Sequence, residues 1–220
     1  MTARRVKQRS SIARAVDCVT FPLRAFTLFH RDAFGLACQA TERYDFAASV
    51  VRGRCLDVGC GSNRFMREFL HDDGIGVDVH RHEDNPDGLV VESLQTFPWP
   101  DESFASVTFL ANINHVPEHD RDLELAEAYR VLEPGGNIVV TMAKPSVEIV
   151  VHKVVWLYDR LFGTKLDHDN ERGMKEGEEL YLTAEEITTR LTRAGFQDIA
   201  YRGFWTQWNF NGMFVGWKRP

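Results

Sequence analysis

The sequence predicts an α/β protein whose core is a doubly wound, mostly parallel sheet. Three observations lead to this fold class. Strand-like and helix-like segments alternate after about residue 50, which is typical of parallel sheets. A glycine-rich turn joins the first of these strands to the first helix, as in open α/β sheets. With 220 residues, the chain is long enough for one well-cored domain.

The first fifty residues precede this alternation and have a helical pattern. A polar, mobile start is expected to about residue 14, followed by helix from Ala15 to Val51. Pro22 and Gly35 are expected to break that helix into pieces. The predicted units are a helical lid or extension (1–50) and an α/β domain (51–220) with a substrate-side insert (145–183).

The strands and helices of the second unit are predicted from hydrophobic pattern and turn residues. The strand candidates are 54–58, 74–79, 88–92, 105–110, 137–142, 198–205 and 213–218. The helix candidates are 64–70, 120–132, 147–162 and 184–194. The last two strands have no helix between them, so we expect them to pair antiparallel.

Composition and charge exclude several classes of protein. A net charge of -6 argues against nucleic acid as the main partner, because phosphate binding needs a basic field. Apolar runs stay shorter than the roughly 18 residues of a membrane span. A signal peptide is not expected, since Asp17 and Arg24 interrupt the stretch after the basic start. The four cysteines lack metal-ligand spacing, which favours reduced thiols in a cytoplasmic protein.

The strongest local signal is the segment 55–65, CLDVGCGSNRF, where an apolar strand leads through a glycine turn into a helix. Gly59 and Gly61 lack Cβ atoms, so the backbone can turn tightly and a ligand can come close. Asp57 precedes the turn, and Asp78 ends the next strand, where an acid can accept hydrogen bonds from both ribose hydroxyls.

The same turn discriminates between nucleotides. The dinucleotide fingerprint requires glycine where this chain has Arg64. A turn flanked by acids suits a cationic ligand without phosphates, and S-adenosylmethionine (SAM), with its ammonium and sulfonium, is such a ligand. Asp57 is expected to face the ammonium.

Four blocks together give a family resemblance: LDVGCG (56–61), GVDV (76–79), FPWPDESF (97–104) and YRVLEPGG (129–136). In this order and spacing the chain resembles the class I SAM-dependent methyltransferases, especially the small "methyltransferase type 11" enzymes related to the ubiquinone pathway. The resemblance implies a seven-stranded sheet with an antiparallel last strand and SAM as cofactor.

The resemblance also implies which residues bind the cofactor. The methionine end is expected against Asp57, the turn and the end of the fourth strand, and the adenosine against Asp78 and the segment after it. The implied cofactor-binding residues are Asp57, Gly59, Cys60, Gly61, Asn63, Asp78, Val79, Ser93, Leu94, Leu110 and Ala111.

The chain departs from the family pattern in three places. Asn63 stands where a third glycine is usual, and asparagine tolerates a left-handed backbone. Ser93, beside Glu92, replaces the acid expected at the adenine edge. The segment 80–88 is polar and reads as a loop where the family has a helix, which opens that edge of the adenine pocket.

His115, after the fourth strand, is the candidate general base, because histidine titrates near neutral pH. The ordinary reading is a loop histidine that packs or caps the next helix. A metal site with His119 is rejected, because Pro117 between them disfavours a regular helix. The acidic run 167–179 is interpreted as a solvated loop, and no metal is predicted.

The acceptor is expected to be a small molecule or a lipid-like compound, and no motif gives its identity or the oligomeric state. Basic residues before an apolar, aromatic helix (Phe21, Phe26, Phe29) are compatible with peripheral contact to an anionic membrane, although packing on the domain is the more ordinary reading. Two other functions stay open: a non-catalytic scaffold with this fold, and an NAD-dependent oxidoreductase, which Arg64 argues against.

Overall fold

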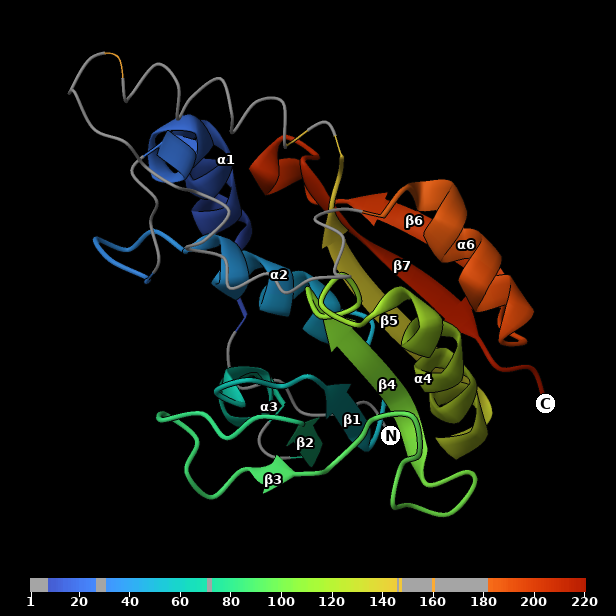
Figure 1. Ribbon diagram of the computed structural model, residues 1–220. Helices are drawn as coiled ribbons and strands as arrows, with labels where there is room; N and C mark the ends of the chain where they lie inside the picture. The colour runs from blue at the N-terminus through green and yellow to red at the C-terminus, as the bar shows by residue number, and fades with distance from the viewer. Residues whose placement is uncertain (1–7, 27–30, 71–72, 146, 148–159, 161–181) are drawn as a thin grey trace.

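The computed structural model describes residues 8–26, 31–70, 73–145, 147, 160 and 182–220. Its centre is a seven-stranded sheet with the strand order β3-β2-β1-β4-β5-β7-β6 (Figure 1). The strands are β1 (Cys55–Val58), β2 (Gly74–Asp78), β3 (Leu89–Val90), β4 (Phe104–Leu110), β5 (Leu132–Ala143), β6 (Gln197–Gly203) and β7 (Asn211–Trp217). The helices are α1 (Ser11–Phe26), α2 (Gln39–Ala48), α3 (Arg64–Phe69), α4 (Glu118–Val131), α6 (Ala184–Arg193) and the 3-10 helix η2 (Trp205–Gln207).

The pairing of the strands confirms the predicted topology. β1 to β5 pair parallel with their neighbours. β7 inserts between β5 and β6 and is antiparallel to both. The sheet is therefore doubly wound and mostly parallel, with an antiparallel last strand, and its switch in strand order lies between β1 and β4.

Each face of the sheet carries its own apolar core, because neighbouring residues of a strand point to opposite faces. In β5, Ile138 and Val140 pack in a cluster with residues of α4 and α6. Val139, between them, packs in a second cluster with residues of α2 and α3. The helices thus cover both faces, and α2 and α3 share a face beside the carboxyl end of β1.

Helix α1 begins earlier than the sequence predicts. It starts at Ser11, although the polar start was expected to run to about residue 14. Arg9 explains the difference, because its guanidinium pairs with Asp17 and its backbone N–H donates to Asp45 of α2. Arg14 pairs with Asp45 as well, at 2.7 Å. These side-chain bonds fix the start of the helix onto α2.

The predicted break at Pro22 is wrong, because Pro22 lies inside α1. Proline has no N–H, so it leaves the carbonyl of Cys18, four residues earlier, without its helical donor. The indole N–H of Trp208, which follows η2, donates to that carbonyl at 3.0 Å. A residue from the far end of the chain thus supplies the missing hydrogen bond. Gly35, with φ +76°, lies between α1 and α2, as predicted.

Other boundaries differ by a few residues. β5 starts at Leu132 rather than at residue 137, because residues 133–136 form an irregularity in its pairing with β4. Within it, Gly135 N–H donates to the carbonyl of Lys218 at 2.7 Å. β3 has only two residues, and the segment 80–88 contains no helix, as expected. The predicted helix 147–162 and the acidic run 167–179 lie outside the described residues, apart from 147 and 160.

No described helix is long and apolar enough to cross a membrane. In the same part of the chain, no group of three or more His, Cys, Asp or Glu side chains is placed to hold a metal ion.

Candidate cofactor site at the carboxyl edge of the sheet

The turn after β1 has a left-handed backbone at three positions. The φ angles of Gly59, Gly61 and Asn63 are +68°, +52° and +56°. The backbone N–H groups of Gly59 and Cys60 both donate to the carbonyl of Val77 in β2, at 2.8 and 3.1 Å. Asn63 then occupies the N-cap position of α3. The turn is thereby held against β2, and the left-handed conformation expected at Asn63 is present.

Gly59 is required by its neighbour Asn112. A Cβ at Gly59 would lie 2.2 Å from the Cγ of Asn112, far inside van der Waals contact. The space beside Gly59, where the sequence predicted that a ligand comes close, is therefore occupied by the side chain of Asn112. Its Nδ2 is buried and has no hydrogen-bond partner among the described residues. Sequence reasoning missed Asn112, because only the fold brings the end of β4 onto this glycine.

Gly61 faces open space instead. A Cβ there would meet only the ring of His82, at 4.0 Å. Asp78, at the end of β2, accepts the Gly61 N–H on Oδ2 and the His80 N–H on Oδ1, both at 2.9 Å. A carboxylate has about four acceptor positions. Oδ2 also lies 3.4 Å from the Nε2 of His82. Asp78 thus keeps a further acceptor position on Oδ1 while it holds the turn.

Asp57 is an acid buried beneath the turn. It is 2% exposed, and its Oδ1 accepts the hydroxyl of Thr108 in β4 at 2.6 Å. Burial raises the pKa of Asp57 to about 7, against the lowering effect of the Thr108 bond, and the charge of Asp78 adds to the rise. No cation contributes to this balance. A positively charged ligand beside Asp57 would favour its ionised form.

Helix α2 brings further side chains to the turn. Arg64, the first residue of α3, donates to the Thr41 hydroxyl at 2.8 Å and pairs with Asp32 at 3.3 Å. Tyr44 packs its ring 5.6 Å from that of Phe65, and the charge of Asp57 raises the pKa of Tyr44 in addition to burial. Arg64 thus ties the N-terminal helices to the turn.

The remaining predicted residues differ in exposure. Val79 is 39% exposed, while Leu94 is 5% exposed and belongs to the core cluster that includes α4 and α6. Ser93 is exposed, and its hydroxyl accepts the Gln95 N–H at 3.1 Å. Ala111, just after Leu110 at the end of β4, has φ +56° and donates its N–H to Thr141 of β5.

His115 ends a short turn after β4. Its backbone N–H donates to the carbonyl of Asn112 at 2.8 Å, and its side chain is exposed. Pro117 lies at the N-cap position of α4. His115 therefore lies on the turn and His119 on the helix.

Comparisons with known proteins give a methyltransferase domain and its fold. Residues 56–140 match the family model of the methyltransferase domain. Curated relatives include the ubiquinone/menaquinone biosynthesis C-methyltransferases of Stenotrophomonas maltophilia, 26% identical over 76% of this chain, and Brucella anthropi, 29% identical over 59%. The chain spans 63% and 50% of the length of these two relatives.

Solved structures share the fold. A SAM-dependent methyltransferase of Thermotoga maritima has a TM-score of 0.61 and 18% identity, with 92% of this chain and 98% of that chain covered. The Burkholderia thailandensis 1,6-didemethyltoxoflavin-N1-methyltransferase, solved with S-adenosylhomocysteine, has a TM-score of 0.57 and 12% identity, with 100% and 98% covered. The chain therefore has the fold of these SAM-dependent methyltransferases, and its residues 56–140 match the methyltransferase domain.

The residues around the turn after β1 fit SAM, the cofactor that the comparisons indicate. Asp57 offers a buried carboxylate to a cation, and Asp78 offers a carboxylate oxygen to a hydroxyl. Gly61 leaves space that a side chain would fill. The Oδ1 of Asn63 and the Nδ2 of Asn112 are buried polar atoms without partners in the described part of the chain, and both lie beside the turn.

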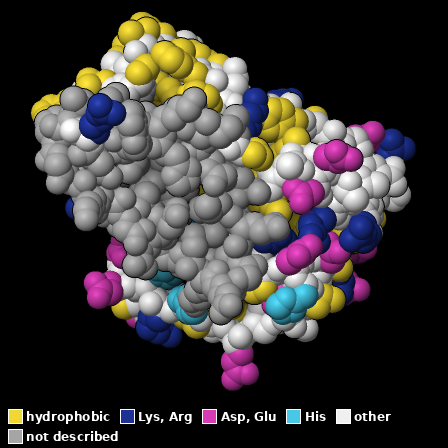
Figure 2. All heavy atoms as spheres, turned by 45° about the horizontal axis from the view of Figure 1, so that its top comes forward, with side chains coloured by type: hydrophobic (Ala, Val, Ile, Leu, Met, Phe, Trp, Pro, Cys, Tyr) yellow, Lys and Arg dark blue, Asp and Glu magenta, His cyan; other side chains and the backbone are white. Residues whose placement is uncertain are grey.

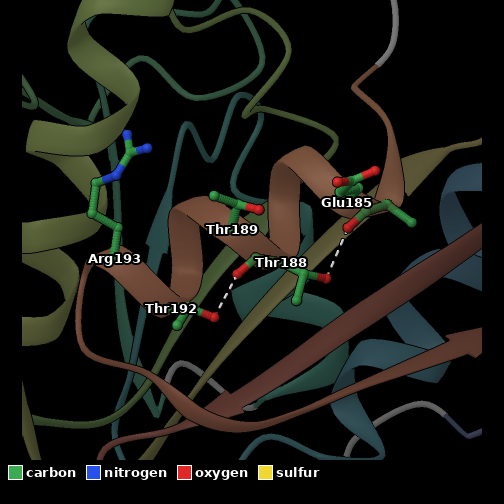
Figure 3. Close-up of a pocket in the computed structure, with 6 residues that line it drawn as sticks. Glu185, Thr188, Thr189, Thr192 and Arg193 are labelled. Atoms are coloured by element: carbon green, nitrogen blue, oxygen red, sulfur yellow. Dashed lines mark hydrogen bonds between the residues drawn. The ribbon is translucent and has the colours of Figure 1, made fainter.

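A surface hollow elsewhere on the protein lies along α6 (Figure 3). The hydroxyls of Thr188 and Thr192 donate to carbonyls of the same helix, both at 2.8 Å. Arg193 extends from the end of the helix and pairs with Asp122 of α4 at 2.6 Å. Thr188, Thr192 and Arg193 are thus already engaged, and the hollow lies away from the turn after β1.

Proposed function

We propose that this chain binds SAM at the turn after β1 and transfers its methyl group to a small, apolar acceptor of the quinone or lipid-like class. The observation that carries the proposal is the buried carboxylate of Asp57 beneath an open glycine turn. Its pKa of about 7 reflects burial without a neighbouring cation. A ligand that brings a cation into that position lowers the cost of ionising Asp57.

Each group of residues has a proposed role. Asp57 holds the ammonium, Asp78 the ribose hydroxyls, and Gly61 gives the space for the ligand to approach the backbone. Val79, Ser93 and Leu94 border the adenine, while Cys60, Asn63, Leu110 and Ala111 border the methionine part. When bound, SAM supplies a methyl group on a sulfonium, a good leaving group. The protein's contribution is to orient the acceptor in line with that methyl.

The acceptor class is proposed from the names of the relatives. The curated relatives are C-methyltransferases of ubiquinone and menaquinone biosynthesis. Methyl transfer to a ring carbon or a hydroxyl needs a base that removes a proton from the acceptor. His115 is the proposed base, since it stands exposed after β4 at the carboxyl edge of the sheet. The N-terminal unit (1–50) and the insert (145–183) are the proposed acceptor-side parts.

Titration calorimetry with S-adenosylhomocysteine tests the cofactor part of the proposal. We expect micromolar binding, and its absence would reject the site. Replacement of Asp57 by Asn should weaken binding at least about tenfold. An NADH fluorescence titration separates the oxidoreductase alternative, for which we expect no change.

Methyl transfer from labelled SAM to short-chain hydroxyquinones tests the acceptor part. His115→Ala should lower the turnover with unchanged S-adenosylhomocysteine affinity, whereas unchanged turnover would remove His115 from the mechanism. Cofactor binding without transfer to any quinone or other small acceptor would favour the non-catalytic scaffold.

A further inference from the structure

Helix α1 exposes its apolar residues. Ile12, Val16, Val19 and Leu23 are 79%, 44%, 79% and 62% exposed. Their spacing of four, three and four residues places them on one stripe of the helix. Figure 2 shows hydrophobic side chains gathered at the top of the view, in the region of α1. We call these four residues the aliphatic stripe.

The charged residues of α1 point the other way. Asp17 and Arg24 are 0% and 1% exposed, and Arg14 is partly buried. Arg24 pairs with Glu42 of α2 at 3.2 Å, and Arg14 pairs with Asp45 of α2 at 2.7 Å. Every α1 residue with a described side chain that is classed as exposed is apolar, apart from Ser11. The list of these apolar residues is Ile12, Ala15, Val16, Val19, Pro22 and Leu23.

This arrangement is the reverse of an ordinary surface helix, which turns its charges to water and its aliphatic side chains to the core. The buried ion pairs fix which face points outward, so rotation of α1 cannot hide the stripe without breaking them. A contiguous exposed apolar face marks a surface that contacts an apolar partner. The orientation of α1 is therefore determined by the fold. The unfavourable free energy of exposing the aliphatic stripe to water is offset when an apolar partner covers it.

Two occupants are conceivable, and the size of the stripe distinguishes them. A stable dimer buries about 800 Å² per partner. Four aliphatic side chains on one helix face supply only part of that area. An amphipathic helix that lies in a lipid surface needs only its apolar face, sunk roughly 5–10 Å into the headgroup region. The aliphatic stripe is large enough for contact with a lipid surface.

The charge distribution of the sequence also fits a lipid surface. Residues 1–16 contain five Lys and Arg and no Asp or Glu, although the whole chain has a net charge of -6. Arg9 and Arg14 are engaged in ion pairs, while Arg4, Arg5 and Lys7, which lie outside the described residues, come four to seven positions before α1 in the sequence. Basic residues beside an apolar helix face attract anionic headgroups. Trp205 and Trp208 are exposed, and both form hydrogen bonds with Cys18 of α1. Tryptophan side chains are enriched at the membrane interface.

We propose that the aliphatic stripe of α1 docks this protein on an anionic lipid surface. The stripe differs from the aromatic face that the sequence alone suggested, since Phe21 is 3% exposed and packs against Trp208 and Phe210. The inference deepens the proposed function, because docking gives an apolar acceptor a direct route to the protein. Docking itself is measured without cofactor or acceptor, so the two proposals fail separately.

Vesicle co-sedimentation tests the docking. The probes are vesicles of phosphatidylcholine and vesicles of phosphatidylcholine and phosphatidylglycerol in equal amounts. We expect the wild type to bind the mixed vesicles more strongly. The double substitution Val16→Gln/Val19→Gln, which keeps residues of good helix propensity, should reduce the bound fraction about tenfold or more. Leu123→Gln, at a site 50% exposed on α4, is the matched control and should bind as the wild type does.

Two readouts keep the test decisive. Calorimetry with S-adenosylhomocysteine should give the same affinity for the Val16→Gln/Val19→Gln variant as for the wild type, which shows that the variant is folded. Sedimentation velocity without lipid should show the same monomer for both. Equal vesicle binding by variant and wild type would overturn the proposal. A lipid-free dimer that the substitution dissociates would overturn it too, because a second copy would then cover the stripe.

Discussion

Asp57 shows how one residue couples burial to ligand binding. Its carboxylate is held by Thr108 and lies under the glycine turn, where its pKa is about 7. At neutral pH the ligand-free protein therefore carries Asp57 in both protonation states, and a cationic ligand selects the ionised one.

The affinity for S-adenosylhomocysteine should consequently depend on pH. We expect the affinity to fall by up to about tenfold per pH unit below about 7, because protonation must be reversed before Asp57 can pair with the ammonium. Calorimetry from pH ~5 to ~8 measures this slope. In Asp57→Asn the slope should vanish, whereas the exposed control Asp87→Asn should keep it. A slope retained in Asp57→Asn would assign the titration to another group.

Gly59 gives a second prediction at the residue scale. Alanine there meets two obstacles, a φ of +68° and the side chain of Asn112. Gly135→Ala is the matched control, since Gly135 has φ +80° with nothing within 4 Å of the added Cβ. We expect Gly135→Ala to cost about 1 kcal/mol and Gly59→Ala clearly more, with loss of ligand affinity.

Urea unfolding and calorimetry measure both effects. Adding Asn112→Ala to Gly59→Ala should recover part of the stability, because it removes the clash and leaves only the backbone strain. Equal losses for Gly59→Ala and Gly135→Ala would show that Asn112 does not determine the need for glycine.

At the scale of elements, α1 and α2 are joined by a buried polar network. Arg24 pairs with Glu42, and both are almost fully buried. Gln207 of η2 donates to Glu42 at 2.7 Å, and Asn211 of β7 donates to Gln207. Burial nevertheless raises the pKa of Glu42. The network connects the N-terminal helices to the start of β7.

Removal of one charge from this network should be more costly than removal of both. Arg24→Met leaves Glu42 buried without its cation, and we expect a loss of about 3–5 kcal/mol in the free energy of unfolding. Arg24→Met/Glu42→Gln should be less destabilised, because no charge then remains buried. Urea unfolding measures both variants, and equal losses would mean that the ion pair contributes only through packing.

Helix α4 contains a different kind of buried acid. Glu124 is 6% exposed, its Oε2 has no partner among the described residues, and burial raises its pKa to about 8. The charge of Asp120 adds to the rise. In the folded state Glu124 keeps its proton at pH values where the unfolded chain has lost it. Stability due to this group is present at low pH and is lost as pH rises from about 4.5 to about 8.

Glu124→Gln should remove this dependence. We expect the variant to match the wild type near pH 4.5 and to exceed it by up to a few kcal/mol near pH 8, as urea unfolding at each pH would show. Glu133→Gln, at an exposed site just after α4, is the control and should follow the wild type. A variant with the same pH slope as the wild type would contradict the prediction.

For the whole molecule, the seven-stranded sheet could be predicted because its signals are local. Each of these signals is formed by residues that are close together in the sequence. They are the alternating strand and helix segments, the glycine turn and the two adjacent last strands. Asp57, Gly61 and Asp78 could be predicted as site candidates for the same reason. The contact between Asn112 and Gly59 could not, since it joins two strand ends distant in sequence.

The N-terminal part was predicted less well, because its structure depends on long-range contacts. Pro22 breaks a helix by local rules, and only the distant Trp208 restores the missing bond. Arg14 and Arg24 pair with acids in α2 and turn inward, which the sequence of the helix alone does not indicate. A single sequence shows which residues are present, but it does not show which distant residues form hydrogen bonds or ion pairs with them.

Ligand binding should be visible in the stability of the whole protein. S-adenosylhomocysteine at a hundred times its Kd should raise the free energy of unfolding by about 2.7 kcal/mol, because it binds only the folded state. Thermal unfolding with and without the ligand measures this, and at the same concentration Asp57→Asn should gain about 1.4 kcal/mol or less, because its affinity is at least about tenfold lower. A gain equal to that of the wild type would place the ligand elsewhere.

The bond from Trp208 to the Cys18 carbonyl spans 190 residues of sequence. During synthesis the N-terminal helix leaves the ribosome long before the tryptophan that completes it. Until nearly the last strand has been made, the Cys18 carbonyl lacks this donor, and the ion pairs with α2 alone orient the aliphatic stripe. Any truncation that removes the C-terminal hairpin should therefore loosen the opposite end of the chain.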